Sequence, residues 1–352
     1  MNYPAPSLHL PANYEKDVVS LRDLSARVGS DPLLVQASNG NTSIKLDGIL
    51  WLKASGKWLA RAQQDDMFVP LELAAVRDSI RNSRGLVPGY VQAGDLRPSI
   101  ETPMHAILRH RVVIHVHSIN TIAWAIRLDG PAQLKQRLDP LHWKWIPYSA
   151  SGIPLARAIE TAVALAPDTD VLILGNHGLV VCGADCDSAE KLLFEVERRL
   201  AISPRPFPDP DTAVLDTLAH SASWQFPDVD SLHSLATDEV SLRILTGGVL
   251  YPCQAIFLGR TMPLLPLTVL KSNLPYPFSG KFNSPAFLAV ERSGVMLNKT
   301  MTTPERATLL ALAQVTQRTE ASAKLRYLQN NEVADVLNMG LYSHNDVAVS
   351  AE

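Results

Sequence analysis

The sequence predicts an α/β protein, in which a sandwich built on a mixed or antiparallel sheet is followed by a smaller α/β domain. Short apolar segments typical of strands alternate with segments of helical periodicity along the chain. The 352 residues exceed the usual size of one hydrophobic core. The segment SPRPFPDPD, residues 203–211, has four prolines in nine residues, which neither a helix nor a sheet tolerates. We therefore expect a first domain over residues 1–202, an extended linker over 203–211 and a C-terminal domain over 212–352.

The elements of the first domain follow from local patterns. Asn13 is expected to cap a helix whose apolar residues recur at helical spacing through Val28. Two short strands, residues 42–46 and 49–53, flank Asp47-Gly48, a dipeptide typical of a hairpin turn. Thr102 followed by Pro103 predicts the start of a helix that runs to about residue 109. The next apolar segment, VVIHVHSIN, predicts a buried strand over about residues 112–117.

Further elements continue the alternation. We expect helices over about residues 118–126 and 154–165, strands over 171–176 and the following HGLVVCG segment, and a helix over 188–202. Beyond the linker we expect helices, a strand pair formed by QAIFLG and AFLAVE, and a long helix capped by Thr303-Pro304-Glu305.

One internal similarity bears on the C-terminal domain. The segment LILGNHGLVVCG followed by a helix is similar to FLAVERSGVMLNK followed by a helix, which aligns His177 with Ser293 and Gly178 with Gly294. Any strand–turn–strand–helix unit has this pattern. If the C-terminal domain is a degenerate copy of the first, it has lost the histidine.

Composition excludes several classes of protein. The net charge is −3 and 46% of the residues are apolar, so a nucleic-acid or membrane-surface partner is not indicated. We find no apolar run of 18 residues and no basic, apolar leader. The three cysteines imply no disulfide framework, which fits a cytoplasmic protein.

Three histidines are candidate metal ligands. His115 and His117 are two residues apart on a predicted strand, so their side chains share one face. His177 lies in GNHG, at the end of another predicted strand, where the glycines permit close approach. Catalytic zinc takes three protein ligands and keeps one open position. The alternative is a set of partly exposed or hydrogen-bonded histidines without a metal.

Glu101 and several small polar residues could complete a site. Glu101 lies just before the Thr102–Pro103 helix start and is either a metal-proximal acid/base or a carboxylate stabilised by the helix dipole. Ser99 could present its hydroxyl to an anion there. The SNGN and ASGK loops could hold a phosphate, or they are ordinary turns. The candidate phosphate contacts in these loops are Asn41, Thr42, Ser55, Gly56 and Lys57. Neither a Walker A loop nor a GxGxxG segment is present.

Five segments occur in an order that resembles the class II aldolase/adducin family, which includes fuculose-phosphate and rhamnulose-phosphate aldolases. They are ASNGNTS, KASGKWL, RPSIETPMH, VIHVHSINTIAWA and LILGNHGLVVCG. The resemblance covers roughly residues 13–202. It implies a three-layer α/β/α sandwich around a largely antiparallel sheet and a homo-oligomer with a small phosphorylated sugar or sugar acid as substrate.

The resemblance also implies roles for particular residues. It implies Zn²⁺, or another divalent transition metal, on His115, His117 and His177. Glu101 would then be the acid/base and a possible fourth ligand. Asn41, Ser55, Gly56 and Ser99 fall where the family holds the substrate phosphate. The catalytic tyrosine that the family takes from a C-terminal segment has no assigned counterpart in this chain.

The implied reaction is a zinc-dependent carbon–carbon cleavage of a phosphorylated ketose or sugar acid through a metal-stabilised enediolate. Glu101 stands where the family's aldolases carry glutamate and its 4-epimerase carries aspartate, which favours an aldolase or a related decarboxylase. The ETP and HSINTIAWA segments are also similar to the epimerase, so a sugar-phosphate 4-epimerase or a decarboxylase of 3-oxo-acid phosphates stays an alternative. A non-catalytic, metal-stabilised interaction module is the alternative from another class.

Overall fold

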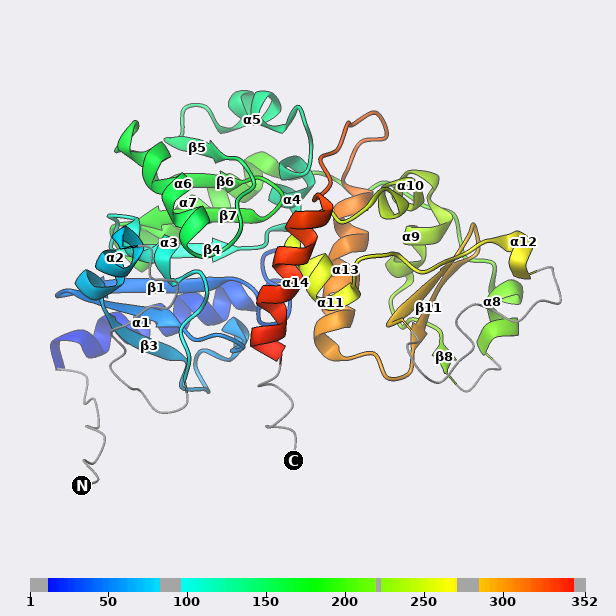
Figure 1. Ribbon diagram of the computed structural model, residues 1–352, viewed down its shortest axis with the longest axis horizontal. Helices are drawn as coiled ribbons and strands as arrows, with labels where there is room; N and C mark the ends of the chain where they lie inside the picture. The colour runs from blue at the N-terminus through cyan, green and yellow to red at the C-terminus, as the bar shows by residue number, and fades with distance from the viewer. Residues whose placement is uncertain (1–11, 83–95, 220–222, 271–284, 345–352) are drawn as a thin grey trace, which may run out of the picture. The chain divides into compact units, whose positions relative to one another are not determined.

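The computed structural model describes residues 12–82, 96–219, 223–270 and 285–344 (Figure 1). By its internal contacts the chain forms two compact units. The first holds the chain up to Thr121 together with Leu134–Leu200, and the second holds Ile122–Gln133 together with Ala201–Tyr342. The segment Ile122–Gln133 therefore belongs to the second unit. The domain limits expected from the sequence, at residues 202 and 212, stay a prediction.

The described part of the first unit is built on a seven-stranded sheet (Figure 1). Its order is β3-β2-β1-β4-β7-β6-β5. Only β5 and β6 run parallel among the neighbouring pairs of this sheet. The strands are β1 (Asn41–Leu46), β2 (Ile49–Lys53), β3 (Phe68–Glu72), β4 (Val112–Val116), β5 (Trp143–Ile146), β6 (Val171–Leu174) and β7 (Gly178–Gly183). The expectation of a mixed, largely antiparallel sheet is confirmed.

The hairpin between β1 and β2 forms as its sequence predicts. Leu46 pairs with Ile49 across the turn, and Asp47 and Gly48 have φ angles of 42° and 83°. Positive φ at both central residues is the requirement of the tight turn that an Asp-Gly dipeptide favours. The strand β1 begins at Asn41, one residue earlier than expected.

Helices cover both faces of this sheet. One face packs against α2, α3 and α6, with Met104, Leu155 and Ile159 in a shared core with Val113 and Leu172. The other face packs against α1 and α7. The helices of this part are α1 (Ala12–Gly29), α2 (Leu73–Arg81), α3 (Thr102–Ile107), α6 (Ile153–Ala164) and α7 (Cys186–Leu200), with a 3₁₀ turn η1 (Leu59–Arg61). Two further helices, α4 (Ile119–Ala125) and α5 (Gly130–Leu138), lie partly in the segment Ile122–Gln133 of the second unit. This arrangement confirms the three-layer α/β/α sandwich.

Two helix starts differ from the expectation. The helix α1 begins at Ala12, so Asn13 lies within the helix instead of capping it. The helix α7 begins at Cys186, two residues before the expected Ser188. Its start is stabilised by Asp185, whose carboxylate accepts the backbone N–H of Ser188 at 2.7 Å.

The second unit holds a four-stranded sheet in its described part, in the order β8-β11-β10-β9. Leu215, Leu288, Val290 and Met296 belong to its hydrophobic core. Its elements are α8 (Thr212–Ala219), β8 (Trp224–Gln225), η2 (Asp230–His233), α9 (Ser234–Thr237), α10 (Glu239–Gly247), α11 (Pro252–Leu258), β9 (Leu264–Leu265), α12 (Leu267–Leu270), β10 (Phe287–Val290), β11 (Gly294–Asn298), α13 (Thr303–Gln317) and α14 (Asn330–His344). A second α/β sheet region was expected and is present.

One strand predicted in this unit is a helix in the structure. The QAIFLG segment lies in α11, which begins at Pro252, and only AFLAVE forms a strand, β10. A short apolar run fits a helix and a strand equally, and proline at the first turn favours the helix. The long helix α13 is present, but its capping residue is Thr302, which exchanges hydrogen bonds with Glu305.

Two further features concern the whole described chain. Cys182, Cys186 and Cys253 are buried and form no disulfide. Within the described ranges, no single helix has the length and apolarity of a membrane span, although the bent pair α10 and α11 meets that test by length and composition alone.

Candidate metal centre

The strand β4 supplies two of the candidate ligands. It lies between β1 and β7 in the sheet, and all five of its residues are buried. His115 lies within it and His117 follows its last residue. The two rings lie on one side with their centroids 5.0 Å apart, as the two-residue spacing predicts. Both side chains are buried.

The turn between β6 and β7 supplies the third histidine. Leu174 pairs with Gly178 across residues 175–177, and Asn176 at the middle has a left-handed φ of 53°. A Cβ on Gly178 would lie 2.5 Å from the carbonyl oxygen of Val116, so only glycine lets β7 approach the end of β4 this closely. His177 is thereby brought to 5.0 Å from His115 and 5.1 Å from His117, measured between ring centroids.

Glu101, which directly precedes the helix α3, is the fourth member of the group. Its Oε1 lies 3.3 Å from Nε2 of His115 and 3.1 Å from Nε2 of His177. One ligand atom from each of Glu101, His115, His117 and His177 lies within 4.8 Å of all the others. Thr102 was expected to cap α3, and this prediction is wrong. Glu101 itself occupies the N-cap position, and Thr102 is the first helical residue. The Thr102 hydroxyl instead donates to the carbonyl of Ser99 at 2.6 Å.

The charge states suit a cation. Burial raises the pKa of Glu101, but its interactions with the adjacent His115 and His177 outweigh burial and hold this pKa well below its usual value. Burial lowers the pKa of His117 well below that of a free imidazole, and the neighbouring histidines lower it further. The group therefore combines an ionised carboxylate with a neutral imidazole at His117, the forms in which these side chains bind metal.

The donor set fits zinc or a similar divalent transition metal. Three imidazole nitrogens and one carboxylate oxygen are ligands that zinc takes in catalytic sites. His115 donates its Nδ1–H to the carbonyl of Leu179 at 3.0 Å, which fixes the tautomer and presents Nε2 to the centre. This Nε2 is buried and makes no well-formed hydrogen bond among the described residues. A metal ion would satisfy it.

Asn41 contacts the carboxylate from the neighbouring strand. It pairs with His115 across the β1–β4 ladder, and its Nδ2 donates to Oε2 of Glu101 at 2.7 Å. The same amide lies 3.4 Å from the hydroxyl of Ser99, which accepts the backbone N–H of Glu101 at 3.2 Å. The structure therefore brings the expected residues Asn41 and Ser99 to Glu101.

Sequence reasoning missed two residues behind this contact. His105 hydrogen-bonds to Asn41 through Nε2 and to the hydroxyl of Ser43 through Nδ1, the latter at 2.7 Å. Both residues are buried. The signal was present in the sequence, since His105 follows Glu101 by one helical turn and Ser43 shares the strand face of Asn41.

The loop after β2 runs beside the segment that leads to Glu101. Ala54 forms an antiparallel bridge with Pro98, and the backbone N–H of Ser55 donates to the carbonyl of Arg97 at 2.8 Å. Ser55 and Gly56 are exposed and Lys57 is half-buried. The pairing brings this loop next to the 97–99 segment, where an anion-binding role for Ser55, Gly56, Lys57 and Ser99 stays a prediction.

Thr42 is excluded from the proposed phosphate contacts. It lies between Asn41 and Ser43 on β1, so its side chain points to the opposite face of the sheet. Its hydroxyl is fully buried and hydrogen-bonds to the hydroxyl of Ser25 in α1 at 2.6 Å. Among the residues expected to contact the substrate, Thr42 faces away from the centre because side chains alternate along a strand.

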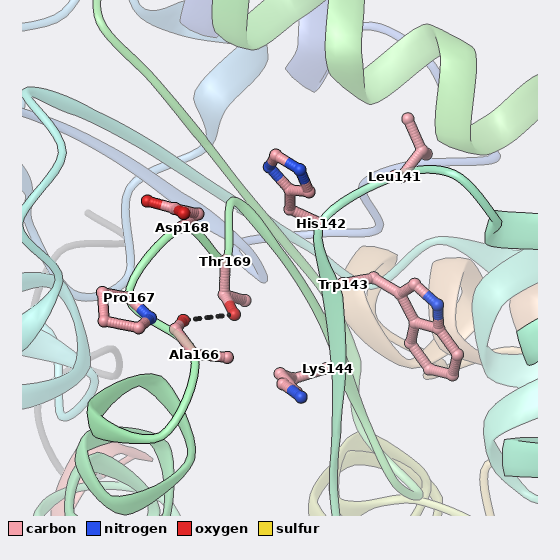
Figure 2. A pocket seen from close by; sticks show the side chains of 8 residues that line it. All are labelled: Leu141, His142, Trp143, Lys144, Ala166, Pro167, Asp168 and Thr169. Carbon is pink, nitrogen blue, oxygen red and sulfur yellow. Dashed lines mark hydrogen bonds between the residues drawn. The ribbon is translucent and has the colours of Figure 1, made fainter.

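A separate cavity of about 310 Å³ lies elsewhere in the first unit (Figure 2). It is lined by residues 141–144, at the start of β5, and by residues 166–169, which lead into β6. Figure 2 shows the side chains of His142, Lys144 and Asp168 on this lining. His177 follows the other end of β6, so the cavity and the metal centre lie at opposite ends of that strand.

Similar proteins were found by sequence and by structure. The chain is 29% identical over 191 residues to the uncharacterized oxidoreductase YuxG of Bacillus subtilis (strain 168), which covers 49% of this chain and 27% of the relative. The chain thus spans about a quarter of the length of this curated relative.

Two solved structures illustrate the similarity. The N-terminal class II aldolase domain of a conserved Thermoplasma acidophilum protein is 21% identical, with 56% of this chain and 98% of that chain covered and a TM-score of 0.48. The L-fuculose-1-phosphate aldolase of Thermus thermophilus is 18% identical, with 53% and 92% covered and a TM-score of 0.37.

A family assignment rests on a longer match. Residues 23–203, just over half of the 352-residue chain, match the family described as the class II aldolase and adducin N-terminal domain. The sheet order and the histidine–glutamate group described above lie inside this range. The chain belongs to the class II aldolase and adducin family.

Proposed function

We propose that this protein is a zinc-dependent lyase that cleaves a carbon–carbon bond of a small phosphorylated ketose or sugar acid. The observation that carries the proposal is the convergence of Glu101, His115, His117 and His177 within 4.8 Å in a buried centre. The three histidines would hold the metal. When bound, a divalent ion would polarise the carbonyl and adjacent hydroxyl oxygens of the substrate and stabilise the negative charge that forms as the bond breaks.

Glu101 would move the proton. Its Oε1 faces the histidines and its Oε2 is held by Asn41, so one oxygen is directed at the substrate's position and the other is anchored. An ionised carboxylate in a buried, partly dry site can take a proton from a substrate hydroxyl at Oε1 and return it to the new product. A fixed orientation matters because proton transfer requires hydrogen-bond distance.

The loop after β2 would hold the phosphate. Gly56 and Lys57 supply a backbone N–H and a cation, and Ser55 and Ser99 supply hydroxyl groups, which are common phosphate contacts. The loop's pairing with the 97–99 segment supports this role, because that segment leads directly to Glu101. Binding there would place the reacting end of a small sugar phosphate near the metal.

The same centre would support a 4-epimerase or a decarboxylase, since both use the same charge stabilisation. Glu101 stands where the family's epimerase carries aspartate, and this favours cleavage. The name of the Bacillus subtilis relative suggests redox chemistry, but only 27% of that protein is matched. We therefore do not extend that suggestion to this chain.

The test compares metal content with turnover in the full chain. Wild-type protein is expected to bind about one divalent ion and to release an aldehyde from one member of a set of phosphorylated ketoses and sugar acids. His115→Ala should lose both the ion and the activity while its circular dichroism spectrum is retained. Elemental analysis and an aldehyde-coupled assay measure the two properties.

A matched variant controls for the loss of a histidine. His142→Ala changes an exposed histidine at the separate cavity and should keep both metal and activity. Unchanged metal content in His115→Ala would contradict the proposed centre. Metal without turnover on any substrate of the set would favour the non-catalytic interaction module.

A further inference from the structure

Four buried side chains form a continuous hydrogen-bond chain beneath the metal centre. In order they are Ser43, His105, Asn41 and Glu101, and we call them the Ser43–Glu101 chain. His105 is fully buried in α3, one turn after Glu101, and Ser43 is fully buried in β1, on the strand face of Asn41. None of these residues except Glu101 contributes a ligand atom to the metal group.

The direction of every hydrogen bond in this chain follows from its last member. An ionised carboxylate only accepts, so the amide of Asn41 must turn Nδ2 toward Oε2 of Glu101. Its Oδ1 then faces Nε2 of His105 and can only accept, so this nitrogen carries the proton. In a neutral imidazole the other nitrogen, Nδ1, accepts, and the Ser43 hydroxyl donates to it at 2.7 Å.

Burial supports the neutral form of His105. It lowers the pKa of His105 well below that of a free imidazole, and the cation of Lys45 lowers it further. With His105 neutral, the hydroxyl of Ser43 selects the tautomer that bears its proton on Nε2. The opposite tautomer would require the amide of Asn41 to rotate and place its carbonyl oxygen against the carboxylate of Glu101.

We propose that His105 and Ser43 are positioning residues, which fix the amide of Asn41 and through it the carboxylate of Glu101. The inference deepens the proposed function and rests on it, because Glu101 is its acid/base. With Oε2 anchored by Asn41, Oε1 stays directed at His115 and His177, at 3.3 and 3.1 Å. Without the hydrogen bond from Asn41 the carboxylate of Glu101 is free to rotate, and Oε1 is no longer held near His115 and His177.

The test uses three substitutions in the full chain. His105→Leu removes both hydrogen bonds, Ser43→Ala removes only the donor to Nδ1, and His105→Gln keeps an N–H within reach of Asn41. Ser25→Ala is the matched control, because it removes a buried serine hydroxyl on the opposite face of β1. Each protein is loaded with Co²⁺, whose visible absorption bands report the ligand geometry, and is assayed on the sugar phosphate that the wild type cleaves.

A positioning role predicts a specific pattern. His105→Leu should lower kcat by roughly 10–100-fold, as loss of an outer partner of a metal centre typically does, with much less change in KM. Its Co²⁺ bands should shift. Ser43→Ala should show a smaller effect of the same kind, His105→Gln should recover part of the loss, and Ser25→Ala should match the wild type.

The contrary result is wild-type kcat and wild-type Co²⁺ bands in both His105→Leu and Ser43→Ala. If His105→Leu does not fold, Ser43→Ala decides alone, and a wild-type profile in that variant overturns the inference. A merely structural role would lower stability without this separation of kcat from KM.

A second measurement separates this inference from the proposed function. In metal-free wild-type protein with ¹⁵N-labelled histidine, the resonances of His105 should show a neutral ring protonated at Nε2. A ring protonated at Nδ1 alone, or at both nitrogens, would overturn the inference whether or not the protein binds metal. Wild-type protein that binds no divalent ion would contradict the proposed function and leave the tautomer result as the measure of the hydrogen-bond chain.

Discussion

Lys53 is a buried cation at the end of β2. Its side chain is 2% exposed, and its Nζ donates to the carbonyl of Ser38 at 2.8 Å. Burial lowers its pKa from 10.5 to about 8, although the negative charge of Glu101 acts in the opposite direction. The residue therefore holds the loop that precedes β1 and makes the stability of the fold depend on pH.

The sign of this dependence follows from the two protonation states. Between pH 8 and 10.5 the unfolded chain binds the Lys53 proton and the folded chain does not, so the free energy of unfolding rises with pH. The rise amounts to about 3 kcal/mol for this group. Across that window the stability difference between the wild type and Lys53→Met should move in favour of the wild type by about this amount.

Urea unfolding of the metal-free proteins at several pH values measures this difference. The pKa of Lys45 is also lowered to about 8 by burial, and its contribution cancels because both proteins carry it. A difference that stays constant from pH 7.5 to 10.5 would contradict a lowered pKa at Lys53.

At the scale of elements, the β6–β7 turn decides whether the centre forms. It carries His177, and Gly178 allows β7 to lie against the end of β4. Gly178→Ala should separate these strands, displace His177 and reduce metal content, with a loss of about 1–3 kcal/mol in stability from overpacking. Elemental analysis and thermal unfolding measure the two effects.

Gly48→Ala is the control for this glycine. Gly48 has a φ of 83° in the β1–β2 hairpin and open space around its Cβ position. The variant should cost about 1 kcal/mol through backbone strain and keep its metal. Equal metal content in Gly178→Ala and Gly48→Ala would show that close approach at Gly178 does not govern the centre.

Elements of the second unit repeat part of the first. The order β8-β11-β10-β9 corresponds to β4-β7-β6-β5, with one parallel and two antiparallel pairs in the same places. The β10–β11 turn also has three residues, and Arg292 has a φ of 56°, as Asn176 has 53°. This agreement supports our interpretation of the second unit as a degenerate copy, in which Ser293 stands at the place of His177.

At the scale of the whole molecule, the chain enters the second unit before the first is complete. Arg127 is 5% exposed and pairs with Asp129 and Glu320, and its backbone bridges Leu325. A chain that ends at residue 202 lacks Glu320 and Leu325, so Arg127 keeps only Asp129. We expect its unfolding midpoint to fall by about 2–4 °C, because an ion pair with an exposed partner such as Glu320 contributes at most about 1 kcal/mol.

Metal content should survive this truncation, since all four proposed ligands precede residue 202. Glu320→Gln in the full chain removes only the ion pair and should lower the midpoint less. A truncated chain with the wild-type midpoint would argue that residues 1–202 are an independent domain, as the sequence predicted.

Local patterns in the sequence were sufficient for much of this protein. The alternation of strands and helices predicted the sandwich, Asp47-Gly48 predicted its hairpin, and the spacing of His115 and His117 predicted one shared face. These features depend on neighbours within a few residues, so periodicity and turn chemistry encode them. The strand predicted for the QAIFLG segment was wrong because a short apolar run does not distinguish a helix from a strand.

The tertiary structure alone decided which distant side chains meet. It brought His177 to His115, turned Thr42 toward Ser25 and placed His105 behind Asn41. These contacts depend on strand register and on the packing of α3 against the sheet, and a shift of one residue would reverse every side chain on a strand. The sequence by itself determined the ligand types and their local spacing, while long-range packing determined the centre that they form.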